Sequence, residues 1–162
     1  MAYDAFIKID GITGDSTDRA HPGEIVLLSY SFGVTNPVRL TTGGGGAASG
    51  RNSFQDLHFT AALSKASPQL FARCVSGTHI AHATLTVRKA GESPIDFYIV
   101  KLSTVVISSY SDAFVFANGD LPVDSVSLAF GKIEIQYKSQ NADGGIGAVI
   151  SAGWDVQRNK LA

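Results

Sequence analysis

The stretch VSLAFGKIEIQY, residues 126–137, shows most directly what kind of fold this chain adopts. Its apolar residues recur at every second position, which is the period of a β-strand with one buried face. The phase changes once, from an even-numbered to an odd-numbered set: Val126, Leu128 and Phe130, then Ile133, Ile135 and Tyr137. Because a glycine inside a strand commonly marks a bulge, this change predicts a β-bulge at Gly131–Lys132 that curves the sheet.

The same alternation runs through other segments that are separated by Gly, Asp, Asn and Pro. The further predicted strands are 3–9, Ile25–Val34, Gln55–Thr60, Ala83–Lys89, Ile95–Ser108 and Gly153–Arg158. Seven strands in 162 residues predict an all-β fold, either a two-sheet sandwich or a barrel. At this length one domain over residues 1–162 is expected.

The segment ASPQLFARCVSG, residues 66–77, is the exception and predicts one short α-helix. Ser67 is a suitable N-cap, Pro68 suits the first helical position, and Gly77 suits the left-handed C-terminal position. One stripe of the helix is apolar and is expected to face the sheet: Leu70, Phe71, Cys74 and Val75.

The composition favours some kinds of partner and argues against others. Hydrophobic residues make up 44% of the chain and charged residues only 17%, below the roughly 25% usual for soluble proteins. Such a surface leaves apolar area exposed, which favours an oligomer. The net charge of −1 and the lack of a Lys/Arg cluster argue against nucleic acid as a partner. No window reaches 18 continuous apolar residues, so membrane insertion is not expected, and the first residues do not resemble a signal peptide.

Residues 36–52 follow neither period and contain four consecutive glycines, which predicts a long loop. A phosphate-binding loop would need Lys and Ser or Thr after the glycines, and Arg51 and Asn52 stand there instead. The following SFQDLHFT predicts a strand rather than the helix that such a loop requires. A linker between domains is also disfavoured, since no separate core composition precedes it.

Candidate chemistry is sparse, and the chain is not expected to be an enzyme or to need a cofactor. His79 and His82 are three positions apart and would point to opposite faces of a strand, and a catalytic zinc site needs three converging ligands. Cys74 is interpreted as a small core residue. There is no G-x-S-x-G nucleophile motif, and Asp112, Asp120 and Asp124 suggest a hairpin tip rather than paired catalytic acids.

Several blocks in order resemble the haemolysin-coregulated protein (Hcp) family: EIVLLSYSFGV, FQDLHFT, KASPQLFARCVSGTHI, ATLTVRKAGE, VSLAFGKIEIQYKSQNADGG and GWDVQRNK. The resemblance covers nearly the whole chain and is weakest around residues 114–122. It implies a two-sheet β-barrel with one short helix, similar to phage tail-tube proteins. It also implies hexameric rings that stack into the tube of a bacterial type VI secretion system.

By the same resemblance, the tube is assembled in the bacterial cytoplasm inside a contractile sheath, is capped by a spike, and is exported without a signal peptide. It carries small effector proteins in its lumen. The glycine loop then corresponds to an extended arm that contacts the neighbouring ring. The residues assigned to this arm are Asn36, Pro37, Gly43, Gly44, Gly45, Gly46, Gly50 and Arg51.

The strand from Ile25 offers candidates for the lumen wall. Its alternation predicts that Ile25, Leu27, Ser29 and Ser31 share one face, which passes from apolar to small and polar. Because the family places this strand at the lumen, Ser29 and Ser31 are the candidate effector contacts. The alternative reading is a monomeric ligand-binding β-barrel with the glycine loop as its lid.

Overall fold

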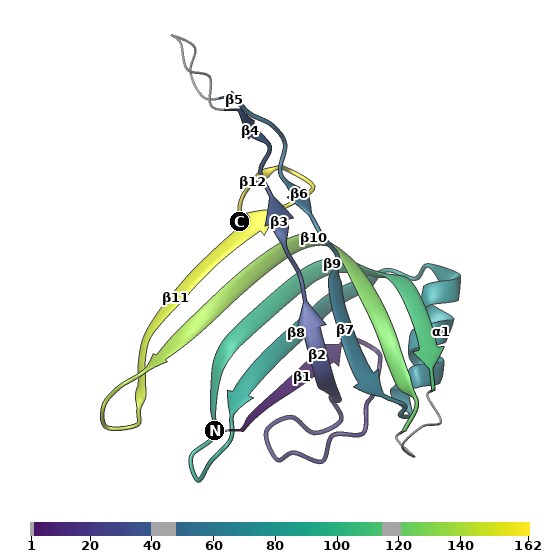
Figure 1. Ribbon diagram of the computed structural model, residues 1–162, viewed down its shortest axis with the longest axis vertical. Helices are drawn as coiled ribbons and strands as arrows, with labels where there is room; N and C mark the ends of the chain where they lie inside the picture. Colours follow the sequence, from purple (N-terminus) through teal and green to yellow (C-terminus); the bar gives the residue numbers. More distant parts are fainter. Residues whose placement is uncertain (1, 40–47, 115–120) are drawn as a thin grey trace.

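The computed structural model describes residues 2–39, 48–114 and 121–162, and Figure 1 shows their arrangement. The elements in chain order are β1 (Tyr3–Ile9), β2 (Ile25–Ser31), β3 (Val34–Thr35), β4 (Val38–Arg39), β5 (Ala48–Ser49), β6 (Ser53–Phe54), β7 (Leu57–Ala62), α1 (Ala66–Ser76), β8 (Ile80–Lys89), β9 (Ile95–Ala113), β10 (Val123–Gln140), β11 (Ile146–Asp155) and β12 (Lys160–Leu161). A strand lies at each of the seven predicted places, which confirms the mainly β prediction.

Six strands close into a barrel. The main sheet has the order β12-β11-β10-β7-β2-β1-β8-β9, and β9 also pairs with β10. The β9–β10 pairing joins the sheet to itself, so that β10, β7, β2, β1, β8 and β9 form a ring. β10 continues past the barrel and pairs with β11 from Lys132 onward. The barrel predicted from the sequence is therefore present, with β11 and β12 as an extension.

Both long strands exchange their buried face at one level of the barrel. In β10 the buried residues change from Val126 and Leu128 to Ile133, as the sequence predicted. The bulge predicted at Gly131–Lys132 is wrong, however, because the register with β9 is continuous from Phe130 to Lys132. The backbone of Thr104 in β9 has φ of 54° at this level, and this left-handed residue turns the pleat. The β9–β10 ladder does contain one register shift, between Ser127 and Leu128, and the unpaired extra residue there is Ser108 of β9.

The barrel interior is filled by apolar side chains from all six strands. Leu57 and Phe59 of β7, Val100 of β9 and Leu128 of β10 have no exposed surface. Ile7 of β1 and Leu85 of β8 are each 1% exposed and belong to the same cluster. Such packing leaves the closed barrel as a solid core.

Helix α1 begins at Ala66, two residues before Pro68, the expected first helical position. The N-cap residue is Lys65 and not Ser67, while Gly77 takes the left-handed conformation at the other end, as predicted. Ser67 is buried, and its hydroxyl donates a hydrogen bond to Asp124 of β10 instead of capping the helix. Leu70 is buried and Cys74 half-buried, but Phe71 and Val75 are 56% and 71% exposed, which corrects half of the predicted apolar stripe. In the part of the chain that the structure describes, no helix has the length and apolar character to cross a membrane.

Candidate functional site

The two candidate serines lie on the outer face of the barrel wall. A register shift between Leu27 and Ser29 turns β2 by one position relative to β7. Ile25 and Leu27 are buried, and beyond the shift Tyr30 packs against the core. The prediction that all four alternate residues share a face is therefore wrong. Ser29 and Ser31 are exposed on the side opposite to the core.

Two rows of small polar side chains cross four strands at this place. The first row is Ser29 on β2, Thr60 on β7, Ser125 on β10 and Ser111 on β9. The second row is Ser31, His58, Ser127 and Ser109 on the same strands. Residues directly opposite one another in a sheet share a face, so these eight form one surface, named here the hydroxyl wall.

The hydroxyl wall is held together by its own hydrogen bonds. The oxygens of Ser29 and Thr60 are 2.6 Å apart, and Nδ1 of His58 lies 3.1 Å from Oγ of Ser127. Ser108, the extra residue of β9, donates to Asp56 at 2.5 Å beside the wall. All eight side chains are exposed or half-buried, and His58 is the sole titratable one. The wall is therefore accessible to solvent and nearly uncharged, and it consists of seven hydroxyl side chains and one imidazole.

The described parts of the predicted loop, residues 36–39 and 48–52, belong to a β-ribbon and not to the irregular loop that the sequence predicted. β3 pairs with β6 and β4 with β5, and Figure 1 shows this narrow ribbon projecting from the barrel. Asn36 and Pro37 lie between β3 and β4, and Gly50 donates its N–H to the carbonyl of Pro37 at 3.3 Å. A Cβ on Gly50 would lie 2.7 Å from Cγ of Pro37, so glycine permits this close approach. Arg51 is exposed at its base, and Gly43 to Gly46 lie outside the described residues.

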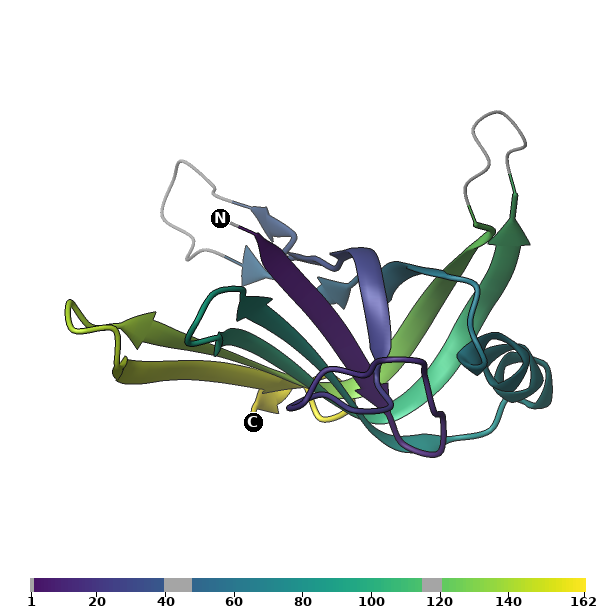
Figure 2. The ribbon, with the colours of Figure 1, turned by 90° about the horizontal axis from the view of Figure 1, so that it is seen from below.

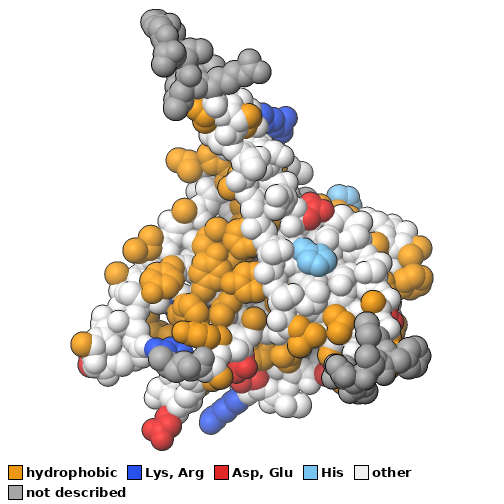
Figure 3. Space-filling model, viewed as in Figure 1, with side chains coloured by type: hydrophobic (Ala, Val, Ile, Leu, Met, Phe, Trp, Pro, Cys, Tyr) orange, Lys and Arg blue, Asp and Glu red, His pale blue; other side chains and the backbone are white. Residues whose placement is uncertain are grey.

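An apolar groove lies where the arm meets the β10–β11 extension. Its lining comes from the arm base and from the extension: Phe32, Gly33, Val34, Phe54, Ile133, Ile135, Ala152, Gly153, Trp154 and Leu161. Val34 and Leu161 are 55% and 76% exposed. Figure 3 shows the large hydrophobic patch of this face below the arm. Exposed apolar residues continue along β11 at Ile146, Val149 and Ile150.

A second apolar surface surrounds α1. Phe71 is exposed and packs edge-on against Tyr110 at 6.1 Å between ring centroids, and Leu63, Pro68 and Asp112 complete a shallow pocket. Figures 1 and 2 place α1 and β11 at opposite ends of the molecule. The two apolar surfaces of one chain therefore cannot meet each other.

Asp124 of β10 anchors α1 to the barrel through two residues that line this pocket, Ser67 and Tyr110. Its carboxylate is 1% exposed and accepts a short hydrogen bond from Oγ of Ser67 and a bond of 2.9 Å from the Tyr110 hydroxyl. Burial and the neighbouring Asp124 raise the pKa of Tyr110 to about 12. Asp124 lies at the β9–β10 hairpin, as expected, but its role as a buried acceptor was not predicted.

Candidate metal ligands do not converge. Within residues 2–39, 48–114 and 121–162 no group of three or more His, Cys, Asp or Glu could hold a metal ion. His79 and His82 are both exposed, and His82 lies opposite Ser103 of β9. The described surfaces thus offer hydrogen-bonding groups on the hydroxyl wall and apolar side chains at the two ends.

The comparisons with known proteins agree with this architecture. Residues 6–137 match the family described as type VI secretion system effector, Hcp. The chain is also 38% identical to protein Hcp1 of Pseudomonas aeruginosa, over the full length of both.

The chain belongs to the Hcp family.

Solved structures of the Hcp family share its fold. A type six secretion system protein superimposes with a TM-score of 0.93 at 27% identity, covering 99% of this chain and all of that one. Hcp1 from Salmonella typhimurium gives a TM-score of 0.82 at 32% identity, with both chains fully covered. The family resemblance seen in the sequence is therefore confirmed.

Sequence reasoning missed most of the hydroxyl wall of this Hcp chain. It selected Ser29 and Ser31 from one strand, but Thr60, Ser125 and Ser127 carry the same signal. In H-F-T and S-V-S a polar residue alternates with a buried apolar one. Aligning these alternations across predicted neighbours would have indicated a polar surface, but the neighbours are set by sheet order, which the sequence did not supply.

Proposed function

We propose that this Hcp chain is a structural subunit of the type VI secretion inner tube, in which hexameric rings stack into a hollow tube. The observation that carries the proposal is the hydroxyl wall, which extends over four strands as a solvent-accessible surface of seven hydroxyl side chains and His58. A channel wall needs such a surface, because it must stay hydrated and must release what passes along it. Ser29 and Ser31 would face the lumen and contact small effector proteins.

Ring closure is supported by the two apolar surfaces at opposite ends of the molecule. The groove lined by Trp154 and Leu161 and the helix surface with Phe71 expose apolar area at separate places. An association that joins different surfaces of identical subunits is head-to-tail, and it closes into a ring when the rotation permits. The β11 surface of one subunit would thus lie against its neighbour in the ring.

The arm would connect one ring to the next. It projects from the barrel as a thin ribbon, and thus offers contact area beyond the body of its own subunit. Its proposed contact residues are those assigned from the sequence, from Asn36 to Arg51. Ordering such a segment costs about 1–2 kcal/mol per residue, which contacts between rings would offset.

The proposal includes a route through the cell. The subunit would assemble in the bacterial cytoplasm within the contractile sheath, receive the spike, and be exported with it. Export through the secretion machine itself requires no signal peptide.

Light scattering coupled to size exclusion, with negative-stain images of the same peak, tests the ring. A mass near six subunits and ring-shaped particles with an open centre are expected. Ser31→Cys in a Cys74→Ser background, labelled with a small gold cluster, should place the gold at the centre of the averaged ring. Thr78→Cys, on an exposed turn away from the wall, is the matched control and should not.

The monomeric ligand-binding barrel would give a different result. It predicts a mass near 17.0 kDa and no central gold density. The packed interior, in which Leu57, Phe59 and Leu128 have no exposed surface, also disfavours an internal ligand. A monomer over a range of concentrations would contradict the tube proposal.

A further inference from the structure

The segment between β1 and β2, residues 10–24, is folded back on itself and ends beside a buried histidine. Backbone hydrogen bonds join Gly14 to Gly23 at 2.7 Å and Ser16 to Glu24 at 3.0 Å. His21 is 6% exposed, and its ring stacks flat on Phe6 of β1 at 4.6 Å between centroids. His21 is thus one of the side chains that hold this segment on the barrel, together with Gln69, which bonds to the backbone of Thr13, and Arg88, which bonds to Asp18.

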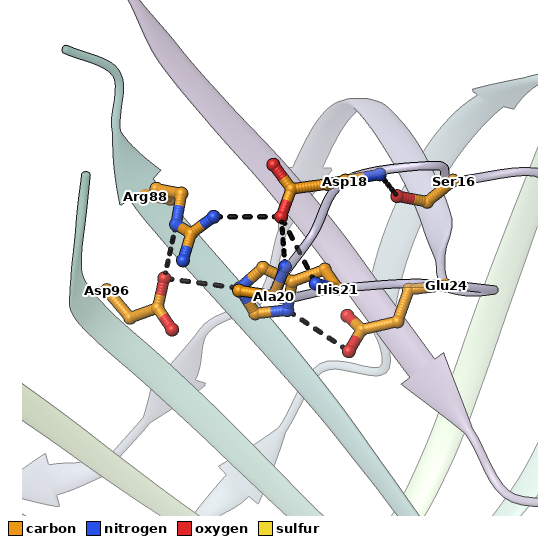
Figure 4. Close-up of polar contacts among 7 residues, drawn as sticks. All are labelled: Ser16, Asp18, Ala20, His21, Glu24, Arg88 and Asp96. Atoms are coloured by element: carbon orange, nitrogen blue, oxygen red, sulfur yellow. Dashed lines mark hydrogen bonds and ion pairs between the residues drawn. The ribbon is translucent and has the colours of Figure 1, made fainter. Parts of the chain in front are cut away.

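Both ring nitrogens of His21 face carboxylates, as Figure 4 shows. Nδ1 lies 3.1 Å from Oε1 of Glu24, and Nε2 lies 3.2 Å from Oδ1 of Asp96 in β9. An ionised carboxylate can only accept hydrogen bonds, and a neutral imidazole has only one N–H to donate. The observed geometry is therefore complete only when His21 carries both protons.

The other charged groups around His21 reinforce this requirement. Arg88 of β8 donates from Nε to Asp96 at 2.9 Å and from one terminal nitrogen to Asp18 at 2.8 Å. Two carboxylates, Asp18 and Asp96, thus contact the guanidinium of Arg88, and a third, Glu24, contacts the His21 ring. Oε2 of Glu24 is buried without a hydrogen-bond partner among the described residues.

The remaining faces of the site hold few charges. On β1, exposed Asp4 and Lys8 flank Phe6, and Asp4 lies opposite Arg88. β8 and β2 place uncharged Thr86 and Val26 opposite Phe6. If His21 loses one of its two ring protons, Glu24 and Asp96, both half-buried, compete for the one N–H that the ring retains.

We propose that His21 is a protonation-dependent clasp, which locks residues 10–24 onto the barrel when doubly protonated and releases them when it loses a proton. In the locked state the His21 ring donates hydrogen bonds to Glu24 and Asp96 at the same time. The inference goes beyond the proposed tube function and holds for a single subunit as well as for a ring.

The direction of the pH dependence follows from the site. Burial by itself lowers the pKa of His21, but the hydrogen bonds to Asp96 and Glu24 and their charges outweigh it, so the pKa is raised. A group with a raised folded pKa stabilises the fold fully below its unfolded pKa, near 6.5, and loses this contribution as pH rises through the folded value. The clasp therefore opens toward alkaline pH.

Asp18 determines the low-pH end of the range in which the clasp is closed. The N–H of Ala20 lowers its pKa most, and the N–H of His21 and the charge of Arg88 lower it further, so that the opposing effect of burial is outweighed. A lowered pKa stabilises the fold above the unfolded value, near 3.9, and the contribution is lost as pH falls through the folded one. The clasp is complete between these limits.

Trypsin reports on the clasp directly, because Arg19 is exposed and is the sole Lys or Arg in residues 10–24. Cleavage after Arg19 would be followed by mass spectrometry between about pH 6 and about pH 9, the range in which a histidine can titrate. Each rate would be divided by that of a synthetic peptide of residues 10–25, which removes the pH dependence of trypsin. The normalised rate should rise several-fold with pH in the wild type.

The variants separate the clasp from general instability. In His21→Gln the normalised rate should be high and flat, while His82→Gln, at an exposed histidine of β8, should behave as the wild type. A flat wild-type profile, or an unchanged rise in His21→Gln, would overturn the proposal. If His21→Gln does not fold, an NMR titration of the ring-labelled wild type decides: the His21 ring should titrate above the usual 6.5, and a value at or below it would overturn the clasp.

Discussion

Thr104 lies across the β9–β10 ladder from Gly131, and the two residues mark the level at which both strands exchange their buried faces. A Cβ placed on Gly131 would lie 3.2 Å from Cβ of Thr104 and 3.0 Å from Cδ of Gln157. The threonine adopts φ of 54°, a left-handed conformation unusual for a β-branched residue. The absence of a side chain at one position thus makes room for the turned backbone at the other.

Gly131→Val is expected to destabilise the fold by about 1–3 kcal/mol, the usual cost of forcing extra atoms into a filled site. Chemical denaturation followed by tryptophan fluorescence measures the change. Lys132→Val, at the exposed neighbouring position, adds the same side chain without the clash and is the control. Equal stability of the two variants would contradict the role assigned to Gly131.

Asp124→Ala is expected to cost about 2–3 kcal/mol, because Ser67 and Tyr110 would lose a buried charged acceptor. The loss should be local to α1, so amide exchange in residues 66–76 should increase more than in β1 or β8. Asp112→Ala, at an exposed carboxylate nearby, should change stability little. Comparable losses in both variants would argue against the Asp124 anchor.

Tyr110 should ionise late. Its pKa of about 12 exceeds the usual 10 through burial first and the neighbouring Asp124 second. Since the folded pKa is raised, this contribution to stability is complete below about pH 10 and is lost as pH rises through about 12. Alkaline difference spectra of the wild type and Tyr110→Phe isolate the transition, and a midpoint near 10 would refute the assignment.

Leu161→Glu should weaken the proposed ring without unfolding the subunit, because the side chain is 76% exposed in the groove. The single tryptophan, Trp154, lines the same groove and reports on its burial. On dilution, wild-type fluorescence should shift to the red as subunits separate, and the variant should show the shifted spectrum at every concentration. Leu161→Met should retain the wild-type behaviour.

Deleting Gly43 to Gly46 should leave single rings intact and abolish both stacking and secretion. Negative-stain images distinguish rings from stacked tubes, and secretion can be followed in culture supernatants. Tubes or secretion at the wild-type level would remove the arm from the mechanism.

Local periodicity predicted much of this fold. The strands around Ile7, Phe59 and Leu128 were found from alternation alone, because each has one face in the core. The helix end at Gly77 was found because few residues other than glycine adopt a left-handed backbone easily.

The errors arose where pairing between distant strands overrides the local pattern. The register shift after Leu27 depends on β7 and cannot be seen in β2 itself, so Ser29 and Ser31 were wrongly expected to share a face with the buried Ile25 and Leu27. Similarly, Gly131 suggested a bulge, but the turned residue is Thr104 on the partner strand. The His21 clasp joins positions up to 75 residues apart, and its members are ordinary surface types when read singly.

The extension outside the barrel has a consequence for how the protein must be produced. Among residues 2–39, 48–114 and 121–162, β12 pairs with β11 only at Trp154 and Asp155, and no other described strand pairs with that edge of β11, where Ile146, Val149 and Ile150 are exposed nearby. Such an edge is a template for adventitious strand pairing until something covers it. In the proposed ring a neighbouring subunit covers this edge, so chains made faster than rings assemble would be prone to aggregate, and the rate of synthesis would have to match the rate of assembly.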